Sequence, residues 1–372
     1  MFDKLAISDK TQKILEKSID ETISKEEANH LINVQGTDLF ALVATADCLR
    51  QDIVGDDVTF INNCNINFTN VCTVKCGFCA FARNKDDSDA YILNDEEILN
   101  KASTAVSNGA REFCLMGGVL ENADIEYYEG LLKLLKDEFP KVSIHGFSPT
   151  MIYDAAANSE MGIDESFKVL KKAGLDTLPG TAAEILTDRS RNLICPSKVD
   201  VAMWIDIIKT AHKNGIPSSA TMMYGHVEDL SERIEHLDIL RNIQKETNGF
   251  TEFIPMTFMY ENSPIYNAGR KNLGATGTED LKLYAVSRLM LRDLIPNIQV
   301  SWVKMGFRFA QISLTAGAND LGGTLGGDEL SEASGAPDGV DTSIDNLCDI
   351  IQDLNRVPLE RDSKYMEFYP NI

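Results

Sequence analysis

The feature that most constrains the fold is a regular alternation of short apolar runs with amphipathic stretches. We predict eight strands, at residues 58–68, 112–116, 141–147, 175–178, 218–223, 251–258, 298–304 and, more weakly, near Leu321. Helical patterns lie between them, at residues 95–107, 127–139, 165–173, 199–213, 230–247 and 279–294. This α/β order predicts a parallel sheet with right-handed crossovers, and eight repeats favour closure into a (β/α)8 TIM-type barrel.

The two ends of the chain lie outside this alternation. Residues 10–52 have helical periodicity, and residues 24–27 have the spacing of a capping box. Residues 343–354 also have a helical pattern. We therefore divide the chain into a helical N-terminal extension at 1–57, a barrel at 58–330 and a C-terminal helical tail at 331–372.

Composition and charge exclude several classes of protein. The 372 residues are 44% hydrophobic and 25% charged, which is ordinary for a globular chain and excludes wholesale disorder. The net charge of −22 opposes binding to nucleic-acid phosphates or to an anionic membrane. The N-terminus does not resemble a signal peptide, and no run approaches the length of a membrane span. We expect a soluble, cytoplasmic protein whose 8 cysteines do not form a secreted disulfide framework.

Three of the cysteines lie together, directly after the first predicted strand. Cys72, Cys76 and Cys79 have the spacing C-x3-C-x2-C. Three thiolates on one short loop can hold three irons of a 4Fe-4S cluster and leave the fourth iron open. The alternative is zinc, but a closed structural zinc site takes four ligands, usually as two separated pairs, and no second pair follows. The spacing therefore favours an iron–sulfur cluster.

Glycine and polar residues follow other predicted strands, where the active sites of barrels are built. Gly117 and Gly118 end the second strand, where the absence of side chains allows a ligand to approach the backbone. His145 ends the third strand and is either a substrate contact or a satisfied strand-end histidine. Glu184, after the fourth strand, either accepts hydrogen bonds from a ligand or begins a helix. The remaining candidates are Ser148, for cofactor, and Tyr224, His226 and Glu228, for substrate.

The cysteine loop, with Phe78 immediately before its third cysteine, resembles the signature of radical S-adenosylmethionine (SAM) enzymes. The resemblance implies that the three cysteines hold a 4Fe-4S cluster, whose open iron chelates SAM and cleaves it to a 5′-deoxyadenosyl radical. It places Phe78 near the adenine, although packing beneath the loop is the alternative for this ring. It also places Gly117 and Gly118 against the methionine moiety. We expect Gly118→Val to weaken SAM binding and to leave the iron content intact.

Four further motifs narrow the resemblance. Residues 65–72, 179–186, 222–228 and 319–325 together resemble the tyrosine-using subunit of FO synthase. The resemblance implies transfer of the 4-hydroxybenzyl group of L-tyrosine to 5-amino-6-(D-ribitylamino)uracil in biosynthesis of the deazaflavin FO, with an electron donor and a companion FO synthase subunit as partners. Two alternatives stay open: a futalosine-pathway radical SAM enzyme of menaquinone biosynthesis, and a non-catalytic barrel stabilised by a metal.

Overall fold

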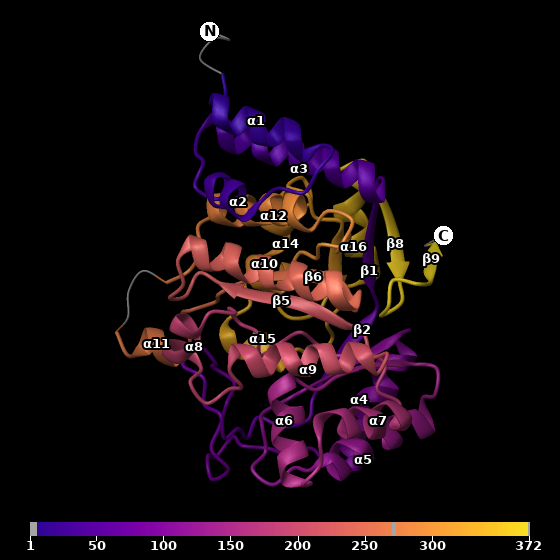
Figure 1. Cartoon of the computed structure of the whole chain (residues 1–372). Helices are drawn as coiled ribbons and strands as arrows, with labels where there is room; N and C mark the ends of the chain where they lie inside the picture. The colour runs from indigo at the N-terminus through magenta and orange to yellow at the C-terminus, as the bar shows by residue number, and fades with distance from the viewer. Residues whose placement is uncertain (1–5, 270–272, 371–372) are drawn as a thin grey trace.

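The structure, a computed structural model, describes residues 6–269 and 273–370 and is built around parallel strands (Figure 1). The strands of this central sheet are β1 (Asp57–Ile61), β2 (Asn63–Asn67), β3 (Glu112–Met116), β4 (Ser143–Gly146), β5 (Ser218–Tyr224), β6 (Phe250–Thr257) and β7 (Asp320–Gly323). β2, β3 and β4 pair in that order, β5 pairs with β6, and β7 pairs with β1. All of these pairs are parallel, as the alternation predicts.

Isolated parallel bridges join these strands into a ring. They are His145–Thr177, Leu178–Ser218, Phe253–Ile298 and Gln299–Asp320. The first two link β4 to β5 through residues 177–178, and the last two link β6 to β7 through residues 298–299. Since β7 pairs with β1, each of the eight predicted strand positions has a neighbour on both sides. The prediction of a (β/α)8 barrel is confirmed.

Two predicted strands are shorter or more divided than expected. The first, at 58–68, is interrupted at Asn62, whose side chain donates to the carbonyl of Asn108 (3.0 Å) and whose carbonyl accepts from the amide of Arg111 (2.8 Å). β1 therefore ends at Ile61 and β2 begins at Asn63, with Asn62 between them. The fourth, at 175–178, forms bridges only.

The predicted strand at 298–304 ends early, because residues 302–305 form the short helix α13 (Trp302–Met305). The indole Nε1 of Trp302 donates to the carbonyl of Gly323 (3.0 Å), and its ring stacks on Phe307 with the centroids 4.3 Å apart. The chain therefore turns across the end of the barrel at Trp302 instead of continuing as a strand.

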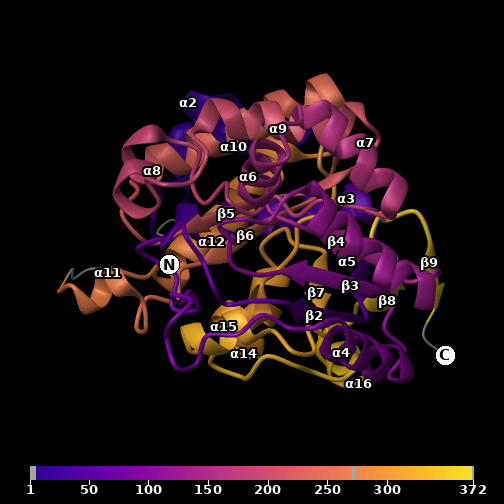
Figure 2. The ribbon, with the colours of Figure 1, turned by 90° about the horizontal axis from the view of Figure 1, so that it is seen from below.

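Helices cover the outside of the ring, as Figure 2 shows for α4 on one side of the strands and α7, α9 and α10 on the other. They are α4 (Asp95–Ser107), α5 (Ile125–Glu138), α6 (Pro149–Asn158), α7 (Ile163–Ala173), α8 (Asp188–Ile194), α9 (Val201–Lys213), α10 (Leu230–Thr247), α12 (Gly277–Leu291) and α14 (Phe307–Leu314). The short α11 (Pro264–Asn267) lies instead beside the cysteine loop, where the amide of Ile265 donates to the carbonyl of Gly77 (2.8 Å). Capping boxes begin α4 and α10, at Asn94 and Asp229. Within the described part of the chain, none of the helices has the length and apolarity needed to cross a bilayer.

The N-terminal extension is helical, as predicted. It contains α1 (Asp9–Ser18), α2 (Lys25–Leu31) and α3 (Thr37–Val54), and the predicted capping box at Ser24 and Glu27 is present. α3 packs against α12, and α2 packs against α10 and α12, so the extension lies over the outer helices, at the top of Figure 1.

The C-terminal tail contains the predicted helix but is not wholly helical. α15 (Glu329–Ser334) and α16 (Ile344–Gln352) are followed by β8 (Val357–Arg361) and β9 (Phe368–Pro370), drawn in yellow beside β1 in Figure 1. β8 pairs with β1 in parallel, and β9 pairs with β8 antiparallel. The helical prediction misses these strands because their pairing is set by β1, some 300 residues away in the chain.

Candidate active site

The three cysteines of the loop after β2 border one cavity at the carboxyl end of the barrel strands. This cavity, which we call the cysteine cavity, has a volume of about 210 Å³. All five residues predicted to contact the cofactor also border it: Phe78, Gly117, Gly118, Ser148 and Glu184. Segments that follow β2, β3, β4 and residues 177–178 therefore converge on one place, as the barrel prediction requires.

The three thiols line the cysteine cavity from a single loop. Within the described residues, no three Cys, His, Asp or Glu side chains come close enough to hold a single metal ion. In a 4Fe-4S cluster each thiolate binds a different iron, so three cluster ligands do not have to meet at a single point. The amide of Val119 donates to Cys72 Sγ (3.3 Å), the kind of bond that stabilises a cluster thiolate.

Burial acts on two of the three thiols, those of Cys76 and Cys79. It raises the pKa of Cys76 to about 12 and raises the pKa of Cys79, although backbone hydrogen bonds from Phe81 and Ala82 act in the opposite direction on Cys79. A buried thiol of this kind ionises when a cation replaces its proton, as iron binding does. The loop can therefore hold the cluster, with Cys72, Cys76 and Cys79 as the ligand candidates.

Gly118 is needed by the cysteine loop itself. A Cβ atom at Gly118 would lie 2.0 Å from the carbonyl oxygen of Val71 and 2.9 Å from Cys72 Cβ. At Gly117 the nearest atom, the carbonyl oxygen of Thr69, would be 3.0 Å away. This geometry contradicts our expectation that Gly118→Val leaves the iron content intact, because a side chain there displaces the backbone that carries a cluster ligand.

Glu184 does not begin a helix, because α8 starts at Asp188. It has a φ of 47°, in the left-handed region, and its side chain accepts a hydrogen bond from Lys198 (2.5 Å). Burial acts to lower the pKa of Lys198, but the neighbouring Cys76 and Glu184 outweigh it and raise the pKa. The Lys198 ammonium also lies 5.1 Å from the centre of the Phe78 ring, so this ring faces charged groups at the cavity.

A second cavity of about 200 Å³ continues into the barrel, and we call it the lumen cavity. Its lining comes from all around the ring, and apolar surface alternates with many polar side chains: Asn63, Asn65, Asn67, Glu112, Cys114, His145, Thr181, Ser219, Thr221, Glu252, Gln299, Ser301, Lys304, Asp328, Ser331, Arg361 and Ser363. β8 contributes Arg361, which pairs with the buried Asp320 (2.6 Å). Such an interior suits a ligand rich in hydrogen-bonding groups.

His145 is the one substrate candidate that borders this lumen cavity. Its Nδ1 lies 2.8 Å from Thr177 Oγ1, and burial lowers its pKa, so the imidazole is neutral near pH 7. Burial also raises the pKa of Glu252, on β6, to about 7. The lumen therefore contains a neutral imidazole and a carboxyl group that carries a proton part of the time.

The other three substrate candidates are not among the residues that line the two cavities. Tyr224 donates its hydroxyl to Asp280 on α12 (2.6 Å). Glu228 accepts from the amides of Gly225 (2.6 Å) and His226 (2.9 Å) and pairs with Arg233 (2.8 Å). These bonds hold the turn after β5, and the roles of Tyr224, His226 and Glu228 toward the substrate stay predictions.

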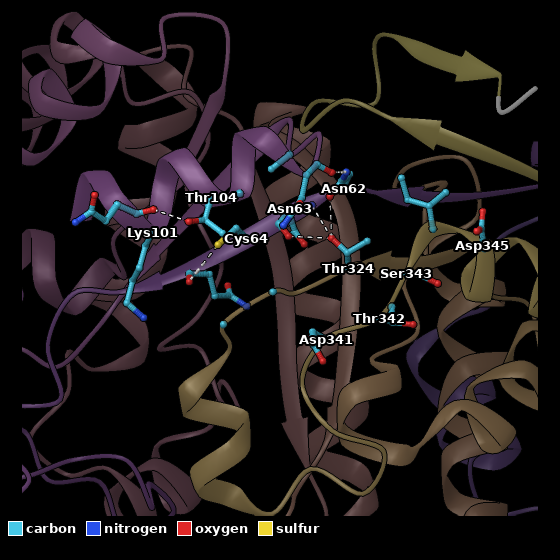
Figure 3. Close-up of a pocket in the computed structure, with 18 residues that line it drawn as sticks. Asn62, Asn63, Cys64, Lys101, Thr104, Thr324, Asp341, Thr342, Ser343 and Asp345 are labelled. Atoms are coloured by element: carbon cyan, nitrogen blue, oxygen red, sulfur yellow. Dashed lines mark hydrogen bonds between the residues drawn. The ribbon is translucent and has the colours of Figure 1, made fainter. Parts of the chain in front are cut away.

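A further cavity lies between α4 and residues 341–345, and Figure 3 shows it in close-up. It has a volume of about 890 Å³. Its polar side chains bond to one another, as where Thr324 Oγ1 donates to Asn62 Oδ1 (3.1 Å) and accepts from the amide of Asn63 (3.0 Å). None of the predicted site residues borders it, so the larger volume does not mark the active site.

Sequence reasoning missed the two lysines of the cavities. Lys198 has no motif around it, and Lys304, after the seventh strand position, reads as barrel filling. It also missed the methionines Met116, Met223, Met256 and Met259, which border the cysteine cavity. The one available signal is the alternation of side chains along a strand, where successive residues face opposite sides. β5 is buried along its whole length, so this alternation cannot show which of its residues face the barrel interior.

Comparison with known proteins agrees with this geometry. The model of the radical SAM superfamily matches residues 66–240, and that of the CofH/MqnC C-terminal region matches residues 247–370. The barrel and its cysteine loop are those of a radical SAM enzyme, a class that uses a 4Fe-4S cluster and SAM. More narrowly, the chain belongs to the family of 5-amino-6-(D-ribitylamino)uracil–L-tyrosine 4-hydroxyphenyl transferases.

Two curated relatives illustrate the family. The transferase of Methanothermobacter thermautotrophicus is 51% identical over 97% of this chain and 98% of its own length. The transferase of Methanocaldococcus jannaschii is 46% identical over 92% of this chain and 96% of its own length. Among solved structures, methylornithine synthase has a TM-score of 0.71 at 20% identity, covering 94% of this chain and 97% of its own. The maturase HydG has a TM-score of 0.73 at 18% identity, and the match covers 96% of this chain and 78% of the HydG chain. These two share the fold.

Proposed function

We propose that this enzyme transfers the 4-hydroxybenzyl group of L-tyrosine to 5-amino-6-(D-ribitylamino)uracil, in the biosynthesis of the deazaflavin FO. The observation that carries the proposal is 51% identity over 97% of the chain to a transferase named for these two substrates. The polar lumen cavity supports it, because a ribityl chain and a uracil ring present many hydrogen-bonding groups.

We further propose that Cys72, Cys76 and Cys79 hold the cluster. When bound there with SAM, the 4Fe-4S cluster supplies a 5′-deoxyadenosyl radical, which ordinary acid–base side chains cannot provide. The chain itself positions the reactants. Gly117 and Gly118 allow the end of β3 to lie close to the cysteine loop. The Lys198–Glu184 ion pair forms a charged wall of the cysteine cavity. Ser148 caps α6 beside it.

The barrel wall also protects the reaction. Apolar side chains of the cysteine cavity, among them Val119, Met223 and Phe258, limit the water near the cluster ligands. The lumen cavity lies directly beneath and shares part of its lining with the cysteine cavity. Two substrates held in register in these joined spaces react as if within one molecule, which is the main contribution of a protein to such a step.

The proposal requires a one-electron donor for the cluster. We also propose a cytoplasmic location, where a reducing environment keeps thiols available for iron. A companion FO synthase subunit is the expected partner, because the resemblance to the tyrosine-using subunit implies a second subunit for the deazaflavin product.

The test is product analysis under anaerobic conditions. Reconstituted enzyme, SAM and a reductant are mixed with L-tyrosine and the ribitylaminouracil, and separately with a futalosine-type substrate, and the products are analysed by mass spectrometry. We expect 5′-deoxyadenosine and a tyrosine-derived uracil adduct in the first mixture only. If no adduct forms from tyrosine and the ribitylaminouracil, but the futalosine-type substrate is converted, the futalosine alternative replaces the proposal. Loss of all activity in Cys76→Ala is the matched control for cluster-dependent chemistry.

A further inference from the structure

Lys304 occupies the junction of the two cavities. Five of the described residues border both the cysteine cavity and the lumen cavity: Met116, Thr181, Met256, Lys304 and Leu330. Lys304 alone among these is charged. It lies in α13, directly after the seventh strand position, where Trp302 turns the chain across the barrel end.

The charge of Lys304 has no carboxylate partner within residues 6–269 and 273–370. Its Nζ donates to Ser331 Oγ (2.6 Å), and an ammonium has three N–H groups to satisfy. Lys198, the other cavity lysine, is by contrast paired with Glu184. Burial lowers the pKa of Lys304, while Asp328, Cys79 and Glu184 act at longer range in the opposite direction. Lys304 is only partly buried, so its ammonium is open to the cavities. With one hydrogen-bond partner and no carboxylate partner among the described residues, it can pair with an anionic group of a ligand held there.

We propose that Lys304 binds the α-carboxylate of an amino-acid ligand, and that this ligand is the substrate L-tyrosine. The inference rests on the proposed function. Tyrosine has to be within reach of both the radical source in the cysteine cavity and the uracil in the lumen, so it lies at their junction, where Lys304 is. The uracil substrate has no carboxylate. SAM does have one, and the experiment separates these two sources.

The test compares L-tyrosine with tyramine, which is the same molecule without the carboxylate. Binding of each is measured by anaerobic equilibrium dialysis against cluster-loaded enzyme with SAM, for wild type, Lys304→Met, Lys304→Arg and the surface control Lys209→Met. Methionine keeps the length of the side chain and removes the charge. Lys209 pairs with Glu246 on the outside of the barrel.

In wild type and Lys209→Met we expect tyrosine to bind at least about thirtyfold more tightly than tyramine, as is typical for a buried charge pair. Lys304→Met should abolish this preference by weakening tyrosine alone, and Lys304→Arg should restore part of it. Iron content, melting temperature and SAM affinity should match those of wild type.

Three results would overturn the inference. One is a tyrosine preference that survives in Lys304→Met. Another is a loss of SAM affinity in that variant with tyrosine binding retained, which would assign Lys304 to the carboxylate of SAM. A wild type that binds both ligands equally would also refute it. Adduct formation by wild type is measured in parallel. If the adduct forms and Lys304→Met still prefers tyrosine to tyramine, only this inference fails. If wild type forms no adduct, the proposed function itself fails.

Discussion

Replacing Gly118 with alanine tests whether the cysteine loop needs the close packing of its backbone against the end of β3. The new Cβ would lie 2.0 Å from the Val71 carbonyl oxygen, whereas such contacts are essentially never shorter than 3.0 Å, so the loop has to move by 3.0 − 2.0, or about 1 Å. Val71 directly precedes Cys72, and the amide of Val119 donates to Cys72 Sγ. The displacement therefore reaches a cluster ligand and a hydrogen bond to its sulfur.

The magnitude follows from these contacts. Overpacking in a well-packed site costs about 1–3 kcal/mol, and loss of one hydrogen bond adds about 1 kcal/mol. If the cluster-bound state bears the whole cost of about 2–4 kcal/mol, the affinity for the cluster falls by about 30- to 900-fold. We expect Gly118→Ala to have low iron content and weak visible absorption after anaerobic reconstitution, and weak SAM binding by calorimetry.

Two alanine variants serve as controls. Gly117→Ala needs a shift of only a few tenths of an ångström, since its nearest contact would be 3.0 Å, so most of the iron should remain. Gly130→Ala, on α5, meets no atom within 4 Å and should load iron fully. Iron content and SAM affinity equal to wild type in Gly118→Ala would refute the reasoning.

Three further predictions follow from particular side chains. Cys72→Ala, Cys76→Ala and Cys79→Ala should each abolish iron loading, whereas the exposed Cys48→Ala should not, and iron analysis after reconstitution decides this. The pKa of Glu252 is raised in the folded state from 4.5 to about 7, so the stability it contributes is full below about pH 4.5 and is lost as the pH rises through 7. Glu252→Gln should therefore gain about 2 kcal/mol relative to wild type between about pH 5.5 and about pH 8.5 in urea titrations, and a constant difference would contradict this. Glu228→Leu leaves the buried Arg233 without its closest partner and should cost about 3–5 kcal/mol of unfolding free energy, whereas Tyr224→Phe should cost only about 1 kcal/mol and leave turnover unchanged.

The sequence predicts the barrel well because its signals are local. Strand composition and helical periodicity alternate, and the cysteine spacing places three thiols on a single loop. The pairing of β8 with β1 has no such local signal: its five residues include Pro358 and the charged Glu360 and Arg361. Glu360 and Arg361 are buried because β8 pairs with β1 on one side and with β9 on the other. Their charges are paired, Glu360 with Arg111 and Arg361 with Asp320.

The sequence predicts those residues of the candidate site that are placed by the end of a strand. It does not predict those whose role depends on the direction of the side chain. Gly118 and Glu184 were found because each follows a strand and so has to lie at the barrel mouth. Tyr224 and His226 follow a strand as well, but β5 is buried on both faces, and the motif cannot tell which residues face the cavity. Lys304 was missed because the turn at Trp302 replaces the expected strand.

In the proposed reaction, a radical generated at the cysteine cavity moves the intact aromatic ring of tyrosine to the uracil. The most direct measurement is mass spectrometry of the adduct formed from ring-deuterated L-tyrosine by anaerobic, reduced, cluster-loaded enzyme with SAM and 5-amino-6-(D-ribitylamino)uracil. We predict that the adduct retains every ring deuterium, that 5′-deoxyadenosine accompanies it, and that the remaining two carbons of tyrosine appear as glyoxylate. An enzyme with a full, reducible cluster that forms no deuterated adduct would contradict the account.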